Sequence, residues 1–135
     1  MTEAKIERIY ETVLYSRNLD AMVEFYADVL GLRLVEGPDE LAAAFRLPNG
    51  GVLLVFDPSR SSAAGRAVPS HGATGAGHVA FSVAPGTLEL WRMRLGKHAI
   101  EVEREVAWDG GGRSLYVRDP ADNSVELTED ELWPA

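Results

Sequence analysis

The segment Gly77-His-Val-Ala-Phe-Ser-Val83 decides the fold, because its second to seventh residues repeat the pattern of Glu11-Thr-Val-Leu-Tyr-Ser16. In both segments the side chains follow an alternating pattern and many are β-forming residues, so each segment is predicted to be a strand. Each is followed by a helical pattern that ends at a glycine, Gly31 in the first half and Gly96 in the second. Three more strand patterns follow in each half, so the sequence predicts an internal βαβββ repeat.

The expected elements follow from hydrophobic periodicity and turn residues. In the first half the strands are 11–17, 32–36, 41–47 and 52–56, and the helix is 19–30. That helix has one apolar stripe, formed by Leu19, Met22, Val23, Tyr26, Val29 and Leu30. In the second half the strands are 78–83, 100–108, 113–118 and 124–128, with a helix from 85–87 to Gly96.

Residues 58–76 differ in composition from the rest of the chain. They are rich in Pro, Ser, Gly and Ala and have no hydrophobic period, which predicts a linker or a functional loop. The chain 1–135 is therefore expected to be one α+β domain, in which this linker joins module 6–57 to module 77–130. Each module alone leaves one face of a small sheet open, so two modules are expected to enclose a shared open-barrel cleft.

Composition excludes several classes of protein. The 135 residues include no cysteine, which excludes disulfides, cysteine zinc sites and a thiol nucleophile. The net charge of -8 disfavours nucleic acid and anionic membranes as partners. No apolar run is long enough to span a membrane, and the first residues do not form a signal peptide, so a cytoplasmic location is expected.

Several short motifs occur in a distinctive order along the repeat. They are Asn18-Leu19-Asp20, Phe25-Tyr26, Val29-Leu30-Gly31-Leu32, Gly77-His78-Val79-Ala80-Phe81, Ser114-Leu115-Tyr116-Val117-Arg118-Asp119-Pro120 and Val125-Glu126-Leu127. This layout resembles the vicinal-oxygen-chelate superfamily, also known as the glyoxalase, bleomycin resistance protein and dioxygenase superfamily. The resemblance covers nearly the whole chain and implies the fold more strongly than any one reaction.

The resemblance implies a metal site built from the first and last strand of each half. By position its members are Glu11, Leu54, His78 and Glu126, of which Leu54 cannot bind a metal. Strand alternation is consistent with the other three side chains pointing into one cleft. Two carboxylates and an imidazole balance one divalent ion, and Mn, Fe(II), Ni, Zn and Mg all suit such ligands.

The resemblance leaves the reaction open among lyases, isomerases, transferases and dioxygenases. Leu54 stands where glyoxalase I would have a carboxylate, so it argues against that enzyme and is expected only to line the pocket. Glu11 is expected either to bind the metal or to act as a general base. The expected substrate is small and oxygen-rich or anionic, and it would be bound through metal chelation.

Further site residues are predicted around these ligands. Fosfomycin-resistance enzymes have a Ser-x-Tyr pattern like that of Ser114 and Tyr116, which implies that these residues and Arg113 contact an anionic substrate. Alternation prevents all three from facing the same cleft, since Arg113 precedes Ser114 directly. His71 is expected either to be a solvated loop residue or to belong to a catalytic lid, and Tyr116 is the other catalytic candidate.

A second function class is a metal-free protein that binds an antibiotic or metabolite, as bleomycin-binding proteins do. Its cleft would need apolar walls, for which Tyr15, Trp108 and Tyr116 are candidates. The family also implies a homodimer, in which modules pair within one chain or between two chains. Of the remaining tryptophans, Trp91 is expected in the core and Trp133 as a packing anchor.

Overall fold

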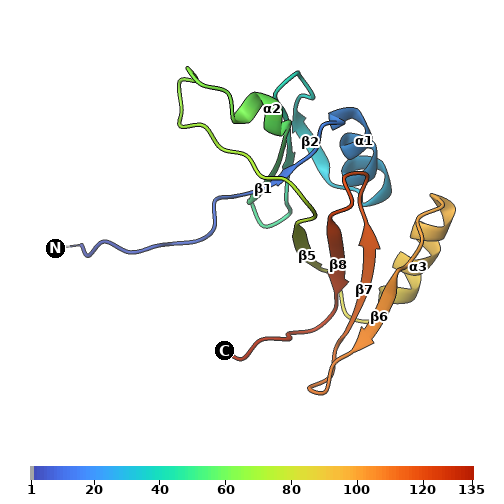
Figure 1. The fold of residues 1–135 in the computed structure, drawn as a ribbon. Helices are drawn as coiled ribbons and strands as arrows, with labels where there is room; N and C mark the ends of the chain where they lie inside the picture. Colours follow the sequence, from blue (N-terminus) through green and yellow to red (C-terminus); the bar gives the residue numbers. More distant parts are fainter. Residues whose placement is uncertain (1) are drawn as a thin grey trace. The chain divides into compact units, whose positions relative to one another are not determined.

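The computed structural model describes residues 2–135, and the chain divides into two compact units, Met1–Gly72 and Ala73–Ala135. Each unit contains one four-stranded mixed sheet and one principal helical segment (Figure 1). The expected α+β class and the βαβββ order of both halves are therefore confirmed. The boundary between the units, after Gly72, falls inside the segment for which a linker was expected.

The first unit is built around a sheet with strand order β1-β4-β3-β2. Its elements are β1 (Glu11–Tyr15), α1 (Leu19–Val23), η1 (Glu24–Val29), β2 (Arg33–Glu36), β3 (Ala42–Arg46), β4 (Val52–Phe56) and α2 (Pro58–Ser61). The pair β1 and β4 is parallel, and the other pairs are antiparallel. Two strands far apart in the unit therefore lie side by side, which brings residue 11 opposite residue 52.

The helix expected over 19–30 is present but changes type along its length. The segment η1 is a π-helix, whose wider turn appears in the bond from the Leu30 amide to the Phe25 carbonyl at 3.0 Å. The wider turn shifts the phase of the buried stripe. As a result Phe25 is buried, whereas Val23, which was placed on the stripe, is only half-buried. Gly31 ends the segment with a φ of 80°, the left-handed conformation that glycine adopts readily.

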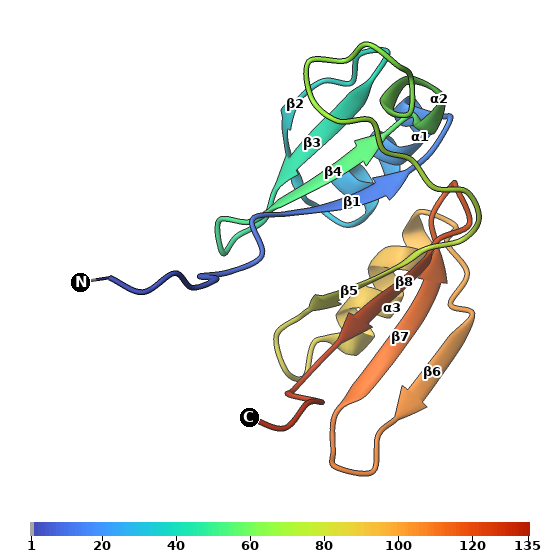
Figure 2. The same cartoon turned by 60° about the vertical axis from the view of Figure 1, so that its left-hand side comes forward.

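The second unit repeats the same arrangement with strand order β5-β8-β7-β6. Its elements are β5 (His78–Ser82), α3 (Leu88–Lys97), β6 (Arg104–Ala107), β7 (Arg113–Arg118) and β8 (Ser124–Thr128). Figure 2 shows α3 on one face of this sheet, with α1 and η1 on one face of the other sheet. The buried core of each unit lies on its helix-covered face, because alternate strand residues such as Leu53 and Leu127 are buried there.

Several expected strands are one or two residues too long, and two expected elements differ more strongly from the structure. The strand predicted over 100–108 covers only Arg104–Ala107, because Ala99 adopts a φ of 57° and Ile100 donates back to Leu95 at the helix end. The first residues of the expected linker form α2, which begins with a proline and is capped by Asp57. A proline at the first turn and an aspartate before it are both favourable helix starts. None of the helices in residues 2–135 is both long and apolar enough to cross a bilayer.

Candidate functional site

The open face of the second sheet carries several polar side chains on neighbouring strands. In the register of the sheet, Glu126 on β8 lies between Ala80 on β5 and Tyr116 on β7. Thr128 lies in the same way between Ser82 and Ser114. Because residues that pair directly share one face, these side chains all point away from α3. The strand alternation expected from the sequence thus brings Ser114, Tyr116 and Glu126 together.

His78 and Glu126 form a contacting pair on this face. The Nε2 atom of His78 lies 3.4 Å from Oε1 of Glu126, and its Nδ1 atom lies 3.0 Å from the Ser124 carbonyl oxygen. A carbonyl oxygen can only accept a hydrogen bond, so the Nδ1 atom carries the proton that this bond needs. In the neutral imidazole the Nε2 atom then presents a lone pair toward the carboxylate.

The other oxygen of Glu126 is held by a network around Ser114. Ser114 Oγ donates to Glu126 Oε2 at 2.6 Å and accepts from the indole N–H of Trp108 at 2.9 Å. The Oγ atom also lies 3.0 Å from Oγ1 of Thr128. Since the serine hydroxyl has one hydrogen and the carboxylate can only accept, the hydroxyl of Thr128 is the donor in that contact. These bonds fix the orientation of a carboxylate whose side chain is only 9% exposed.

Tyr116 borders the pair on the side of β7. Its ring stacks near that of His78, with centroids 6.4 Å apart and planes at 22°. Burial raises the pKa of Tyr116 above its ordinary value, and the negative charge of Glu126 and a hydrogen bond to it raise the pKa further. The phenol therefore keeps its proton at neutral pH, which makes Tyr116 a hydrogen-bond donor beside the carboxylate.

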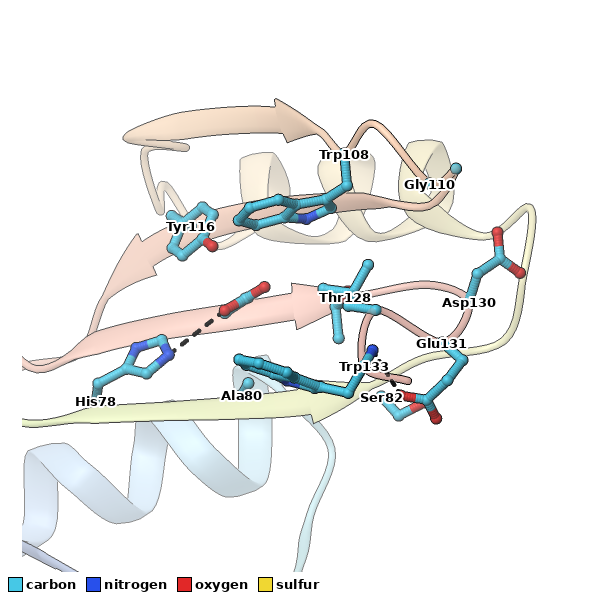
Figure 3. Close-up of a pocket in the computed structure, with 13 residues that line it drawn as sticks. His78, Ala80, Ser82, Trp108, Gly110, Tyr116, Thr128, Asp130, Glu131 and Trp133 are labelled. Atoms are coloured by element: carbon cyan, nitrogen blue, oxygen red, sulfur yellow. Dashed lines mark hydrogen bonds and ion pairs between the residues drawn. The ribbon is translucent and has the colours of Figure 1, made fainter. Parts of the chain in front are cut away.

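This polar face forms the floor of a pocket of about 720 Å³ within the second unit (Figure 3). The pair lies toward one end of the pocket, and Asp130 and Glu131 lie toward the other. The lining residues are His78, Ala80, Ser82, Trp108, Gly110, Gly111, Tyr116, Glu126, Thr128, Asp130, Glu131, Leu132 and Trp133. A concave site of this size with a few convergent polar groups suits a small-molecule ligand.

Arg113 lies on the other face of the same sheet. Its guanidinium contacts Glu129 at 3.3 Å and Glu105 at 3.6 Å. Glu129 is itself buried, and its second oxygen accepts from the Gly86 amide at 2.8 Å. Arg113 thus belongs to a structural ion-pair network and is not among the residues that line the pocket.

The site residues expected from the first half lie in the first unit. Glu11 begins β1 and is exposed, and Leu54 lies on β4 opposite Val13, half-buried on the open face. Tyr15 donates to or accepts from Nδ1 of His71 at 2.7 Å, depending on the histidine tautomer. His71 also packs edge-on against Phe56, with ring centroids 4.7 Å apart, so it is part of the first unit.

The sequence did not indicate every residue of the pocket. Trp133, expected as a packing anchor, is 79% exposed and lines the pocket with its neighbours Leu132 and Glu131. Trp91, expected in the core, is half-buried, and the guanidinium of Arg94 lies 5.5 Å from its ring centroid. Trp108, which the sequence offered as an aromatic wall of a cleft, does line the pocket, whereas Trp133 lies beyond the last strand and no hydrophobic period indicated its place there.

The pair His78 and Glu126 has the chemistry that a divalent ion requires. Histidines that bind metals usually donate their other ring N–H to a backbone carbonyl or carboxylate, as His78 does here. Two atoms bound at about 2.1 Å to one ion lie about 3.4 Å apart at a tetrahedral angle, and the observed separation is 3.4 Å. In residues 2–135 no three such side chains are clustered closely enough to form a site, so the addition of Glu11 remains a prediction.

Comparison with known proteins establishes the family. The model of the Glyoxalase/Bleomycin resistance protein/Dioxygenase superfamily matches residues 8–127. A crystal structure of lactoylglutathione lyase from Agrobacterium tumefaciens shares 40% identity, covering 96% of this chain and 98% of that chain, with a TM-score of 0.89. A glyoxalase/dioxygenase from Nostoc punctiforme is 22% identical, with 97% and 99% covered and a TM-score of 0.69, which shows the fold alone.

A curated relative comes from Bacillus subtilis (strain 168), where it is named "Putative ring-cleaving dioxygenase MhqE". The two sequences are 31% identical over 134 residues, which cover 93% of this chain but 42% of the relative. The chain thus spans less than half the length of that protein. With a family model that matches most of its length and these relatives beside it, the chain belongs to the glyoxalase/bleomycin resistance protein/dioxygenase superfamily.

Proposed function

We propose that the protein is a metal-dependent enzyme whose ion is bound by His78 and Glu126. The observation that carries this proposal is the contact of 3.4 Å between Nε2 of His78 and Oε1 of Glu126. With Nδ1 as the only protonated nitrogen of the ring, two electron pairs face one another, and either a second proton or a metal cation between them makes the contact favourable. A divalent ion supplies positive charge there and leaves coordination positions open toward the pocket.

The bound ion would chelate adjacent oxygens of a small substrate and stabilise negative charge that develops on them. The chain's own residues prepare the site for this. Ser114 holds the carboxylate of Glu126, and the Ser124 carbonyl holds the ring of His78 in one tautomer. Tyr116 keeps its proton, so it can donate a hydrogen bond to a substrate oxygen and does not serve as a base.

Glu11 is the proposed third member of the site and its second carboxylate, as a ligand or as a general base. It begins the first strand of its unit, as His78 begins the first strand of the second unit. The equivalent of Glu126 in the first unit is Leu54, so the first unit offers a single carboxylate for this role. A kinetic and binding comparison separates the two roles: Glu11→Gln lowers metal affinity if Glu11 is a ligand, and lowers only turnover if it is a base.

The names of the relatives suggest two branches of reaction, that of a ring-cleaving dioxygenase and that of a lactoylglutathione lyase. We favour a reaction other than that of glyoxalase I, because Leu54 replaces the expected carboxylate and cannot bind a metal. Glutathione also carries two carboxylates, and the pocket has no lysine or arginine among its lining residues to pair with them. The direct test of this point is turnover of the hemithioacetal of methylglyoxal and glutathione, which we expect to be absent.

The metal itself is tested by adding Mn, Fe(II), Ni, Zn or Mg to protein purified without a histidine tag. We expect one ion per chain and a rise in melting temperature, because a ligand that binds only the folded state stabilises it. His78→Ala and Glu126→Gln should each abolish this rise. His98→Ala is the matched control, since His98 is exposed at the end of α3 and lies outside the pocket. Bound metal in both site variants would show that the ligands are wrong.

The second candidate is a metal-free protein that sequesters a small molecule. The exposed indole rings of Trp108 and Trp133 favour it, because aromatic walls bind flat ligands without any ion. The two candidates differ in one measurement. If none of the five metals shifts the melting temperature of the wild-type protein, the binding protein is the better description.

We also propose a homodimer, because the family implies one and each sheet has an open face. In the first unit this face bears Val13, Leu54 and Phe56, which are half-buried. Burial of such apolar surface is the ordinary source of association energy. Sedimentation velocity at micromolar concentration should give the mass of two chains, and a monomer would contradict the proposal.

A further inference from the structure

Two large aromatic side chains that line the pocket are left exposed to solvent. Trp108 is 40% exposed and Trp133 is 79% exposed. Figure 3 shows their indole rings on opposite sides of the pocket, with the strand of Glu126 and Thr128 between them. Exposed apolar surface is unfavourable in water, and when it is gathered at one concave site it usually marks a binding surface.

Trp108 is held firmly in this position. Its indole N–H donates to Ser114 Oγ at 2.9 Å, so its edge is fixed to the polar floor. Trp133 belongs to the C-terminal segment, and its amide donates to Oε1 of Glu131 at 3.1 Å. One wall is thus anchored to the sheet, and the opposite wall is formed by residues that follow the last strand of the repeat.

The carboxylates and basic side chains of the pocket are unequal in number. Its lining residues include three carboxylates, Glu126, Asp130 and Glu131, and no lysine or arginine. Arg113 is held on the opposite face by Glu105 and Glu129. Arg104 shares the face of Tyr116 through its register on β6, but it is not a lining residue.

We propose that this pocket selects a flat, unsaturated ring that carries no negative charge, held between Trp108 and Trp133. The carboxylates of Asp130 and Glu131 at the outer end favour a positively charged substituent on that ring and disfavour an anionic one. This inference rests on the proposed function in one respect, namely that the reacting oxygens of the substrate face His78 and Glu126. It makes Trp133, which the repeat does not include, a residue that sets specificity.

The proposal is tested with three probes that share a phenyl ring and differ in charge. They are 2-phenylethylammonium, 2-phenylethanol and 3-phenylpropanoate, added to the full chain after metal removal with a chelator. Binding is followed through the indole N–H signals in NMR spectra. We expect the signals of Trp108 and Trp133 to shift while that of Trp91 does not. The ammonium probe should bind about threefold to tenfold more tightly than the alcohol, and the carboxylate should bind more weakly than both.

Two sets of variants separate the contributions of ring and charge. Trp133→Ala should weaken all three probes, and Trp91→Ala is the matched control that should weaken none. Asp130→Asn with Glu131→Gln should bring the affinities of the ammonium and alcohol probes together without changing the metal-induced melting shift, because neither residue is a proposed ligand. The glutamine keeps an oxygen that accepts from the Trp133 amide, so this wall is retained.

Each outcome decides the proposal. Equal or tighter binding of the carboxylate probe would overturn the charge selection, and shifts at Trp91 alone, or no binding of any probe, would overturn the pocket as the binding site. The metal test is independent of these results. If the probe order holds in a protein that binds no metal, the pocket inference stands and the proposed metal-dependent enzyme fails.

Discussion

The two units share one fold but differ in the chemistry of their open faces. Leu54 in the first unit occupies the register position of Glu126 in the second, and Ala44 occupies that of Tyr116. Ala42 in the same way replaces Ser114. Among the described residues, the counterparts of Ser114, Tyr116 and Glu126 in the first unit cannot form such a network, while the buried cores on the helix-covered faces of both units are built mainly from apolar side chains. The comparison teaches that the fold depends on one face of each sheet and leaves the other free to change.

The helix-covered faces should be equally important for stability. Leu53 on β4 and Leu127 on β8 are both 1% exposed. Replacing either with alanine should lower the free energy of unfolding by about 2–5 kcal/mol, because the substitution loses burial and leaves a cavity. Urea denaturation measures both values. A cost below about 1 kcal/mol in one unit alone would break the equivalence of the two cores.

Removing or adding one hydroxyl group should change the free energy of unfolding by different amounts on the open faces of the two sheets. Ser114→Ala removes the donor to Glu126 and the acceptor of the Trp108 indole, so it should cost about 1–3 kcal/mol of unfolding free energy. The matched change in the first unit is Ala42→Ser, which disturbs no such network and should stay within about 0.5 kcal/mol. The same denaturation measurement compares them. Similar effects for the two variants would show that the Ser114 network adds nothing to stability.

The pKa of the Tyr116 phenol should depend on the carboxylate of Glu126 beside it. Its pKa is raised by burial and by Glu126, so Glu126→Gln should lower the pKa toward, but not fully to, the ordinary value. Because the folded pKa lies above the unfolded one, this group's stabilising contribution is complete below pH about 10. It is lost as the pH rises through the folded pKa. A pH titration of the Tyr116 ring carbon in NMR spectra measures the shift, and an unchanged value in the variant would contradict the coupling.

The smallest expected effect concerns the segment that follows α2 in the first unit. His71→Ala removes the hydrogen bond to Tyr15 and the edge contact with Phe56. We expect a loss of about 0.5–1.5 kcal/mol, with faster amide exchange at the His71 amide, which donates to the Ser61 carbonyl. Unchanged exchange there would mean that the side chain does not hold this segment to its sheet.

Much of the fold could be predicted because hydrophobic periodicity and turn-forming residues determine structure over short stretches of sequence. The strands at 52–56, 113–118 and 124–128 have the predicted bounds, since glycine, proline and asparagine punctuate them clearly. The π-helical turn at 24–29 was not predicted, because an apolar stripe indicates a helix without distinguishing the α form from the wider π form. The end of α3 near residue 99 likewise depends on a backbone conformation that the sequence does not specify.

The candidate site was predictable where alternation alone decides the outcome. The register brings Ser114, Tyr116 and Glu126 to one face and leaves Arg113 on the other, as strand periodicity requires. What alternation cannot give is the contact of His78 with the Ser124 carbonyl, or the position of Trp133 beyond the last strand. Both depend on three-dimensional packing, and together they define the chemistry and the walls of the pocket.

The most direct test of the central claim is the protonation state of the His78 ring, read from its two nitrogen signals in NMR spectra with and without zinc. The account predicts a proton on Nδ1 in the metal-free neutral ring and a zinc-induced change at Nε2, which Glu126→Gln weakens. The signals of His98 should stay unchanged in the same spectra. A proton on Nε2 in the neutral ring, or His78 signals that do not respond to zinc, manganese, nickel, iron or magnesium, would contradict the claim that His78 and Glu126 bind a metal ion.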